Sequence, residues 1–232
     1  MLPLAVLFAA AASAHPTTLA VSPARTVFRA PSSRTLQVSN LSSEDVAVSV
    51  AWKALGRPGT PHRWLRIAPG KLVLRGGARG FLTIRADKGA SPGDHDVLVL
   101  VTGTPTDRSR IAVRLRIGVR VRIRAPGRLR RNVAVDSLRV GGSKRGRALL
   151  VSLTNRGNVT EQLGGRVTVT LFRRKRLVSR LRLGRLRELY PATRATAALP
   201  YSGRARGFVT ALVTVRLAPD VRPVERRYRL LL

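Results

Sequence analysis

The sequence predicts an all-β protein made of two β-sandwich domains in tandem, and three observations support this prediction. Residues 110–124 are RIAVRLRIGVRVRIR, in which every odd position is apolar and six of the eight even positions are arginine. Strict alternation over this length indicates a strand, because successive side chains of a strand point to opposite faces. Similar strand patterns, separated by turn residues, recur along the chain without an amphipathic helix pattern. Finally, the second half of the chain repeats the plan of the first.

The first half contains seven predicted strands. We expect them at residues 19–21, 35–40, 46–52, 71–74, 81–85, 97–101 and 110–124. In the third segment Val46, Val48, Val50 and Trp52 share one face, which indicates a half-buried antiparallel strand with Trp52 as the core aromatic. Seven short strands in about 110 residues are typical of an immunoglobulin-like sandwich.

The last predicted strand of the first half is unusually long. Its odd face of Val, Ile and Leu belongs to the core of the first domain. At about 3.3 Å per residue the segment spans roughly 50 Å, more than one small sandwich needs. Either Gly118 divides it into two strands or it continues toward the second domain.

Two similar stretches indicate the repeat. LQVSNLSSEDVAVSV at 36–50 is echoed by LVSLTNRGNVTEQLGGRVTVTL at 150–171. Each has an alternating strand, a corner at Asn40 or Asn155, a polar loop and a Val-rich strand. Pro126-Gly127 lies between the halves and marks the boundary. We therefore expect one immunoglobulin-like domain at 15–126 and a second at 127–232.

The N-terminal residues 1–14, MLPLAVLFAAAASA, predict a secretory signal peptide with a small-residue cleavage site at Ala12-Ser13-Ala14. Its apolar core is too short for a membrane-spanning helix, which needs about 20 residues. We expect an exported protein, periplasmic or extracellular and associated with the cell envelope, without a transmembrane span. The chain has no cysteine, so its domains must be stabilised by packing rather than by disulfides.

The charge is strongly positive. There are 44 Lys and Arg residues and 11 Asp and Glu residues, for a formal net charge of +33. Residues 1–120 hold 17 cations and 6 anions, net +11, whereas residues 121–232 hold 27 and 5, net +22. A GC-rich bacterial genome explains why arginine outnumbers lysine, but not why acids are so few. Such a field concentrates anions and makes association sensitive to salt.

The arginine face of residues 110–124 has two interpretations. Charged side chains protect an exposed sheet edge from pairing with other chains, so the row can be a solvated edge. Alternatively, it receives an anionic partner.

The first domain resembles the N-terminal domain of periplasmic pilus-assembly chaperones over residues 18–126. The resemblance lies in LAVSPARTVFRAPSSRTLQVSN, VAVSVAW, APGKLVLRGGARGFLTIRAD and a long alternating strand that ends in IRAP. The second domain, with TNRGNVT and LYPATRATAALPYSG, is more similar to immunoglobulin-like modules of bacterial surface proteins. The whole arrangement is also similar to the exported WxL-interacting surface proteins of Gram-positive bacteria.

The chaperone resemblance implies a partner-binding site. In that family a basic residue on the first strand and another on the last strand of the first domain clamp the terminal carboxylate of the client, and the last strand pairs with the client. Arg25 in SPARTVF matches the first position, and Arg120 is the candidate for the second, where the family has a lysine. The candidate partner-binding residues are Arg25, Arg114, Arg116, Ile117, Val119, Arg120, Arg122 and Arg124.

Other chemistries find little support. Asp94, His95 and Asp96 in GDHD carry metal-ligand atoms, but adjacent strand residues face opposite ways and the preceding Ser-Pro-Gly is an ordinary turn. No catalytic triad or glycosidase carboxylate pair is evident, so we expect no enzyme, cofactor or metal. The basic clusters GSKRGR at 142–147 and FRRKRL at 172–177 fit hairpin tips or loops. Aromatic residues are 4% of the chain, which argues against nucleic-acid binding.

Two functions remain open. The first is a chaperone-like or scaffold role toward another exported or surface protein, such as a pilus-like client, through β-strand pairing. The second is electrostatic attachment to anionic cell-wall polymers or a membrane surface through the arginine-rich faces. Strand pairing should survive high salt, whereas electrostatic attachment should not.

Overall fold

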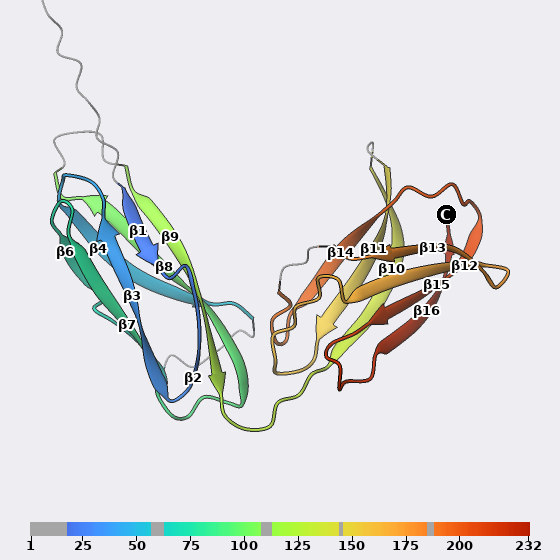
Figure 1. Cartoon of the computed structure of the whole chain (residues 1–232), viewed down its shortest axis with the longest axis horizontal. Helices are drawn as coiled ribbons and strands as arrows, with labels where there is room; N and C mark the ends of the chain where they lie inside the picture. The colour runs from blue at the N-terminus through green and yellow to red at the C-terminus, as the bar shows by residue number, and fades with distance from the viewer. Residues whose placement is uncertain (1–17, 57–62, 108–112, 144–145, 185–187) are drawn as a thin grey trace, which may run out of the picture.

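The computed structural model describes residues 18–56, 63–107, 113–143, 146–184 and 188–232. The predicted signal peptide at 1–14 and the beginning of the 110–124 segment lie outside these residues. The protein is all-β, with two immunoglobulin-like sandwiches that form separate lobes joined by one connecting segment (Figure 1). The described part of the chain contains no helix with the length and hydropathy that a membrane crossing requires.

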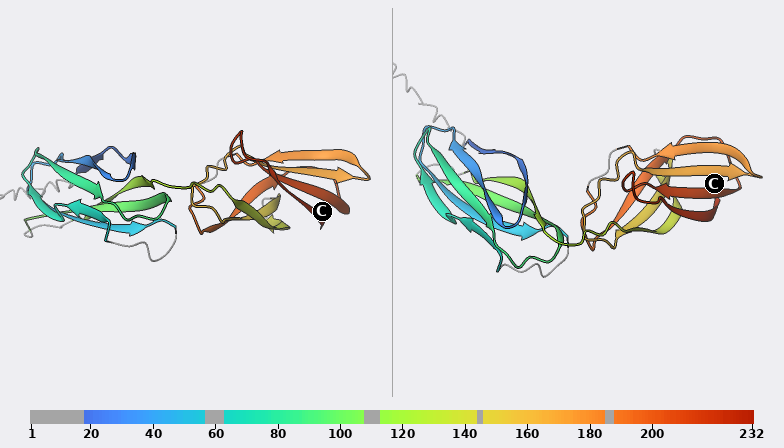
Figure 2. Two further views of the ribbon diagram at one scale, coloured as in Figure 1. Left: turned by 90° about the horizontal axis from the view of Figure 1, so that it is seen from below. Right: turned by 60° about the horizontal axis from the view of Figure 1, so that its bottom comes forward.

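The first sandwich contains nine strands. They are β1 (Leu19–Ser22), β2 (Arg25–Arg29), β3 (Ser32–Asn40), β4 (Val46–Ala54), β5 (Leu65–Ala68), β6 (Lys71–Leu74), β7 (Arg79–Ala86), β8 (Gly93–Pro105) and β9 (Leu115–Ala125). One sheet has the order β1-β3-β7-β5 and the other β2-β9-β8-β4-β6. The two sheets lie face to face as layers (Figure 2). Because β1 and β2 lie in different sheets, the chain crosses from one layer to the other between residues 22 and 25.

Each of the seven predicted segments contains a strand, but the last strand begins at Leu115, so the described residues 113–114 lie before it. Two further strands, β2 and β5, were not predicted. The core aromatic also differs from the prediction. Trp64, just before β5, is 3% exposed and belongs to the core, whereas Trp52 is only partly buried against it. The end of β4 extends beyond the fully buried centre of the sheet, so Trp52 lies at the margin of the core.

Strand β9 is continuous through Gly118. It pairs antiparallel with β8 over its whole length, from Leu115 opposite Gly103 to Ala125 opposite Gly93. A side chain at position 118 would contact Leu98, whose Cδ1 lies 3.1 Å from an ideal Cβ. Val119, Val121 and Ile123 are buried in the core, as the odd-face pattern predicts.

The second sandwich contains seven strands. They are β10 (Val133–Ser143), β11 (Gly146–Asn155), β12 (Val167–Arg173), β13 (Arg176–Arg182), β14 (Arg194–Tyr201), β15 (Phe208–Val215) and β16 (Val224–Leu231). The sheets have the orders β10-β11-β14 and β13-β12-β15-β16. No strand of the described residues crosses positions 126–132, and we propose the domain boundary there, after residue 126.

The two sandwiches share a buried asparagine corner. Asn40 ends β3 and Asn155 ends β11, and both are fully buried. The Nδ2 group of Asn40 donates to the carbonyls of Glu44 and Leu74, and that of Asn155 donates to the carbonyls of Val159 and Leu189. Each asparagine oxygen accepts the backbone N–H two residues on. The repeat seen in the sequence therefore has a common geometry.

The basic cluster FRRKRL forms a hairpin tip, as predicted. Arg173 pairs with Arg176, and the two residues between them, Arg174 and Lys175, have φ values of 46° and 67°. Two consecutive left-handed residues form the tight turn that suits the twist of a hairpin. In the other cluster Gly142 pairs with Arg147 across the β10–β11 hairpin, while residues 144–145 lie outside the described part.

Candidate functional site

The candidate site begins where β2 joins β9. These strands run parallel, and Arg25 is the direct register partner of Arg120. The Arg120 N–H donates to the Ala24 carbonyl at 3.2 Å, and the Ala30 N–H donates to the Arg124 carbonyl at 3.0 Å. The two residues that the sequence suggested as a carboxylate clamp therefore lie side by side on neighbouring strands.

Three arginines converge on one carboxylate at this point. Glu188, a residue of the second domain, places Oε1 2.5 Å from Arg25 Nη2 and 2.9 Å from Arg122 Nη2. Its Oε2 lies 4.0 Å from Arg120 Nη1. We call Arg25, Arg120 and Arg122 the arginine cradle. The side chains of Arg25 and Arg120 are 45% and 52% exposed, whereas those of Arg122 and Glu188 are each 9% exposed.

The cradle favours a negative charge. Burial by itself would raise the pKa of the Glu188 carboxyl, but Arg122 and Arg25 outweigh it and hold the pKa below its ordinary value. Burial opposes the charge on Arg122, yet Asp96 and Glu188 raise its pKa above the ordinary value. The cradle is thus cationic and holds a carboxylate in its ionised form.

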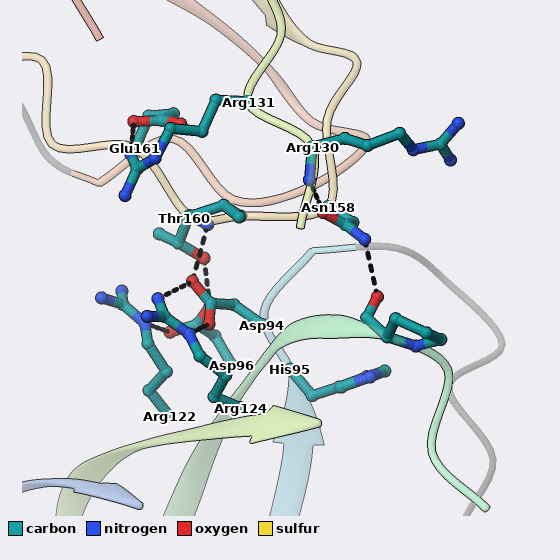
Figure 3. Close-up of polar contacts among 12 residues, drawn as sticks. Asp94, His95, Asp96, Arg122, Arg124, Arg130, Arg131, Asn158, Thr160 and Glu161 are labelled. Carbon is teal, nitrogen blue, oxygen red and sulfur yellow. Dashed lines mark hydrogen bonds and ion pairs between the residues drawn. The ribbon is translucent and has the colours of Figure 1, made fainter. Parts of the chain in front are cut away.

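Beside the cradle, two aspartates of β8 face two arginines of β9 (Figure 3). Arg124 binds Asp94 through Nε at 2.7 Å and Nη2 at 2.9 Å, and Arg122 Nε donates to Asp96 Oδ1 at 2.7 Å. From the second domain, Thr160 donates its N–H to Asp94 at 3.0 Å and its hydroxyl to Asp96. Burial raises the pKa of Asp96, although Thr160 and Arg122 oppose this shift.

The side chain of Asn158, a residue of the second domain, binds backbone groups of the first domain and of the segment that connects the two domains. Its Nδ2 donates to the carbonyls of Pro92 and Arg128, both at 2.9 Å, and its Oδ1 accepts the Arg130 N–H at 2.6 Å. The Asp94 N–H donates to the Asn158 carbonyl at 2.7 Å. This close approach requires glycine at position 93, where φ is 120° and an added Cβ would lie 2.2 Å from the Asn158 oxygen. Figure 3 shows Asn158 and Thr160 above the carboxylates of β8.

One half of β9 presents an open edge next to the cradle. Strand β2 pairs only with Arg120–Arg124, and no other described strand pairs with residues 115–119 on that side. Backbone groups of the even residues of β9 point toward β2, as the Arg120 and Arg124 bonds demonstrate. Since this direction alternates along a strand, Arg116 and Gly118 direct their N–H and C=O groups to the open edge.

Comparisons with known proteins place this geometry in a fold class. No family model matches the chain, and no curated protein matches its sequence. Among solved structures, a chain from the chaperone–tip adhesin complex of CFA/I fimbriae matches with a TM-score of 0.54 and 14% identity, over 90% of this chain and 98% of that one. The chain has the fold of the pilus-assembly chaperones.

Two further structures have the same chaperone fold. One is a chain from the complex of the Salmonella enterica SafA pilin with the SafB chaperone, with a TM-score of 0.53 and 15% identity, covering 93% of this chain and 99% of that one. The other is a chain from the CsuC–CsuE chaperone–tip adhesion subunit complex of Acinetobacter baumannii, with a TM-score of 0.53 and 10% identity, over 92% and 98% of the chains. The predicted fold class and the predicted chaperone resemblance are therefore confirmed. Similarity to WxL-interacting proteins stays a prediction.

Within this chaperone fold the predicted site residues fall into three groups. Arg25, Arg120, Arg122 and Arg124 lie at the domain junction, and all four face carboxylates. Arg114 and Arg116 are exposed beyond the junction. Ile117 is partly buried, and Val119 is fully buried in the core of its own domain. Val119 therefore has no surface to offer a partner, although it stands beside the open edge.

Sequence reasoning missed the acidic partners. Asp94 pairs with Arg124 and Asp96 with Arg122 in the β8–β9 register, and alignment of the two strands as a hairpin was the signal that could have found both pairs. His95 points to the other face, where its ring centroid lies 4.8 Å from that of Trp64. Glu188 carries no comparable signal in the sequence, because only the fold brings it to the cradle.

Proposed function

We propose that this protein is a non-enzymatic, periplasmic chaperone-like protein that binds an exported partner of the pilin or adhesin class. In this proposal the arginine cradle holds the terminal carboxylate of the partner, and the open edge of β9 pairs with the strand that precedes it. The register pairing of Arg25 with Arg120, directly beside an unpaired strand edge, is the observation that carries the proposal.

The geometry defines how such a partner strand would run. Its carboxyl end lies at Arg120 and its earlier residues lie along β9 toward Leu115. The strand is therefore parallel to β9 and collinear with β2. Backbone bonds to Arg116 and Gly118 contribute affinity that does not depend on sequence. Paired arginines favour a carboxylate through charge-assisted hydrogen bonds.

Two peptides test the proposal. One is a short acetylated peptide of alternating valine and threonine with a free terminal carboxylate, and the other is the same peptide closed by an amide. Calorimetric titration should show that the protein binds the acid about tenfold or more tightly than the amide, because each charge-assisted bond contributes about 1.5–3 kcal/mol. In the Arg25→Ala variant this preference should fall. Equal binding of acid and amide by the unmodified protein would contradict the proposal.

A second candidate function is electrostatic attachment to anionic envelope polymers. It is favoured by the net charge of +33, by the exposed Arg116 and Arg120 on the even face of β9, and by the exposed Arg114 just before this strand. Binding of this kind should be released by 1 M NaCl, where the Debye length is about 3 Å. Retention of a polyanion such as heparin at 1 M NaCl would count against a purely electrostatic contact.

A further inference from the structure

A carboxylate of this chain already occupies the cradle, so it competes with any partner carboxylate for the same arginines. Glu188 offers the same two acceptor oxygens and the same charge as the end of a polypeptide. It contacts both residues of the paired clamp, Arg25 and Arg120, and it comes from the second domain while the clamp belongs to the first. A partner carboxylate would need the same nitrogens.

We propose that Glu188 is an internal ligand of the arginine cradle and that it must leave before the carboxylate of a partner can bind. This inference rests on the proposed function and states how partner binding at the cradle is regulated. In the unliganded protein the cradle is then occupied by a carboxylate of the second domain, which offsets part of its positive charge.

The contacts around Glu188 allow such an exchange. Among the described residues outside the cradle, the one hydrogen bond to this carboxylate comes from Gln162, whose Nε2 lies at a long 3.5 Å from Oε1. Arg122 keeps Asp96 as a partner at 2.7 Å when Glu188 leaves, so no buried charge is left without a counter-ion. Arg25 and Arg120 are about half exposed and can rotate toward an incoming group.

An internal competitor also makes the site selective. A tethered carboxylate acts at a high effective concentration, so a free carboxylate in solution displaces it poorly. A carboxylate delivered by a strand already paired with β9 has the same advantage and can compete. Glu188 therefore favours carboxylates that arrive together with a strand over isolated anions.

The test uses the Glu188→Gln variant, which removes the charge and keeps the size of the side chain. Glu225→Gln is the matched control, because Glu225 is an exposed residue of β16 and its substitution changes the net charge equally. Each protein is titrated with the free-acid and amide peptides described above. Removing a competitor that is bound about nine-tenths of the time should tighten binding of the acid about tenfold, with the amide and the control unchanged.

The outcomes separate the two proposals. If Glu188→Gln binds the acid equally or more weakly while both proteins still prefer acid to amide, the internal-ligand inference is wrong and the proposed function stands. If neither protein distinguishes acid from amide, both are wrong. A measurement on the unmodified protein does not depend on folding of the variant: the ¹³C signal of the Glu188 carboxyl should shift when the acid peptide binds. A signal that stays unchanged at saturation would also overturn the inference.

Discussion

At the scale of single residues, the same asparagine geometry occurs in both domains. Asn40 and Asn155 bind carbonyls that lie four and thirty-four residues further along the chain. At this corner the side-chain amide donates to the backbone carbonyls of two separate segments of the chain. Buried carbonyls without a donor are costly, so the corner stabilises both domains.

Replacing either asparagine with alanine should therefore destabilise its domain. Asn40→Ala or Asn155→Ala should lower the free energy of unfolding by about 1–3 kcal/mol, since buried carbonyls lose their donor. Chemical denaturation measures the change. Asn132→Ala, at an exposed asparagine directly before β10, is the control and should leave stability nearly unchanged. If Asn40→Ala and Asn155→Ala are as stable as the control, water takes over the hydrogen bonds that the asparagine amide makes.

At the scale of secondary-structure elements, β9 has two different halves on one continuous strand. Its odd face is core from Val119 to Ala125 but only partly covered at Leu115 and Ile117. Its even face is exposed up to Arg120 and then covered at Arg122 by the second domain. One alternating pattern thus supplies a core face, a partner-accessible edge and a domain contact.

Two isoleucines on the same face of β9 test this division. Ile123 is fully buried, so Ile123→Ala should cost about 2–5 kcal/mol of stability through lost contacts and a cavity. Ile117→Ala should cost clearly less, because its side chain is only partly covered. Denaturant unfolding of the two variants, compared in the same buffer, gives both values. Similar losses would mean that the open half of β9 is as well packed as the other half.

The sequence predicted strands where alternation is strong and missed them where it is weak. Strand β2 is a short segment between Pro23 and Pro31, and β5 is a four-residue segment that ends directly before Pro69. Their places are set by pairing with β9 and β7 rather than by their own pattern. Similarly, the position of Arg25 was predicted from the resemblance, whereas its contact with Glu188 depends on how the domains meet.

At the scale of the whole molecule, ion pairs and hydrogen bonds link the two sandwiches. Asp94 and Asp96 accept bonds from arginines of their own domain and from Thr160 of the other. Because the side chain of Asp94 is fully buried, it is a central element of this junction. The strong positive charge of both domains would otherwise oppose their approach.

Asp94→Ala should uncouple the domains. Arg124 loses a bidentate partner and the Thr160 N–H loses its acceptor. Differential scanning calorimetry should then show the two domains melting further apart in temperature than in the unmodified protein. Asp87→Ala is the control, because Asp87 pairs only with Arg66 and Arg85 of the first domain in the described contacts. The same separation in both variants would show that the junction contributes no coupling.

In the proposed complex, a partner strand pairs with the open edge of β9 and ends in the arginine cradle. Amide hydrogen exchange of the unmodified protein, measured by NMR with and without the free-acid peptide, tests it most directly. Exchange of the Arg116 and Gly118 amides should slow when the peptide is bound, and the side-chain signals of Arg25 and Arg120 should shift. Unchanged exchange at Arg116 and Gly118, with the peptide bound elsewhere, would show that the partner strand does not pair with β9.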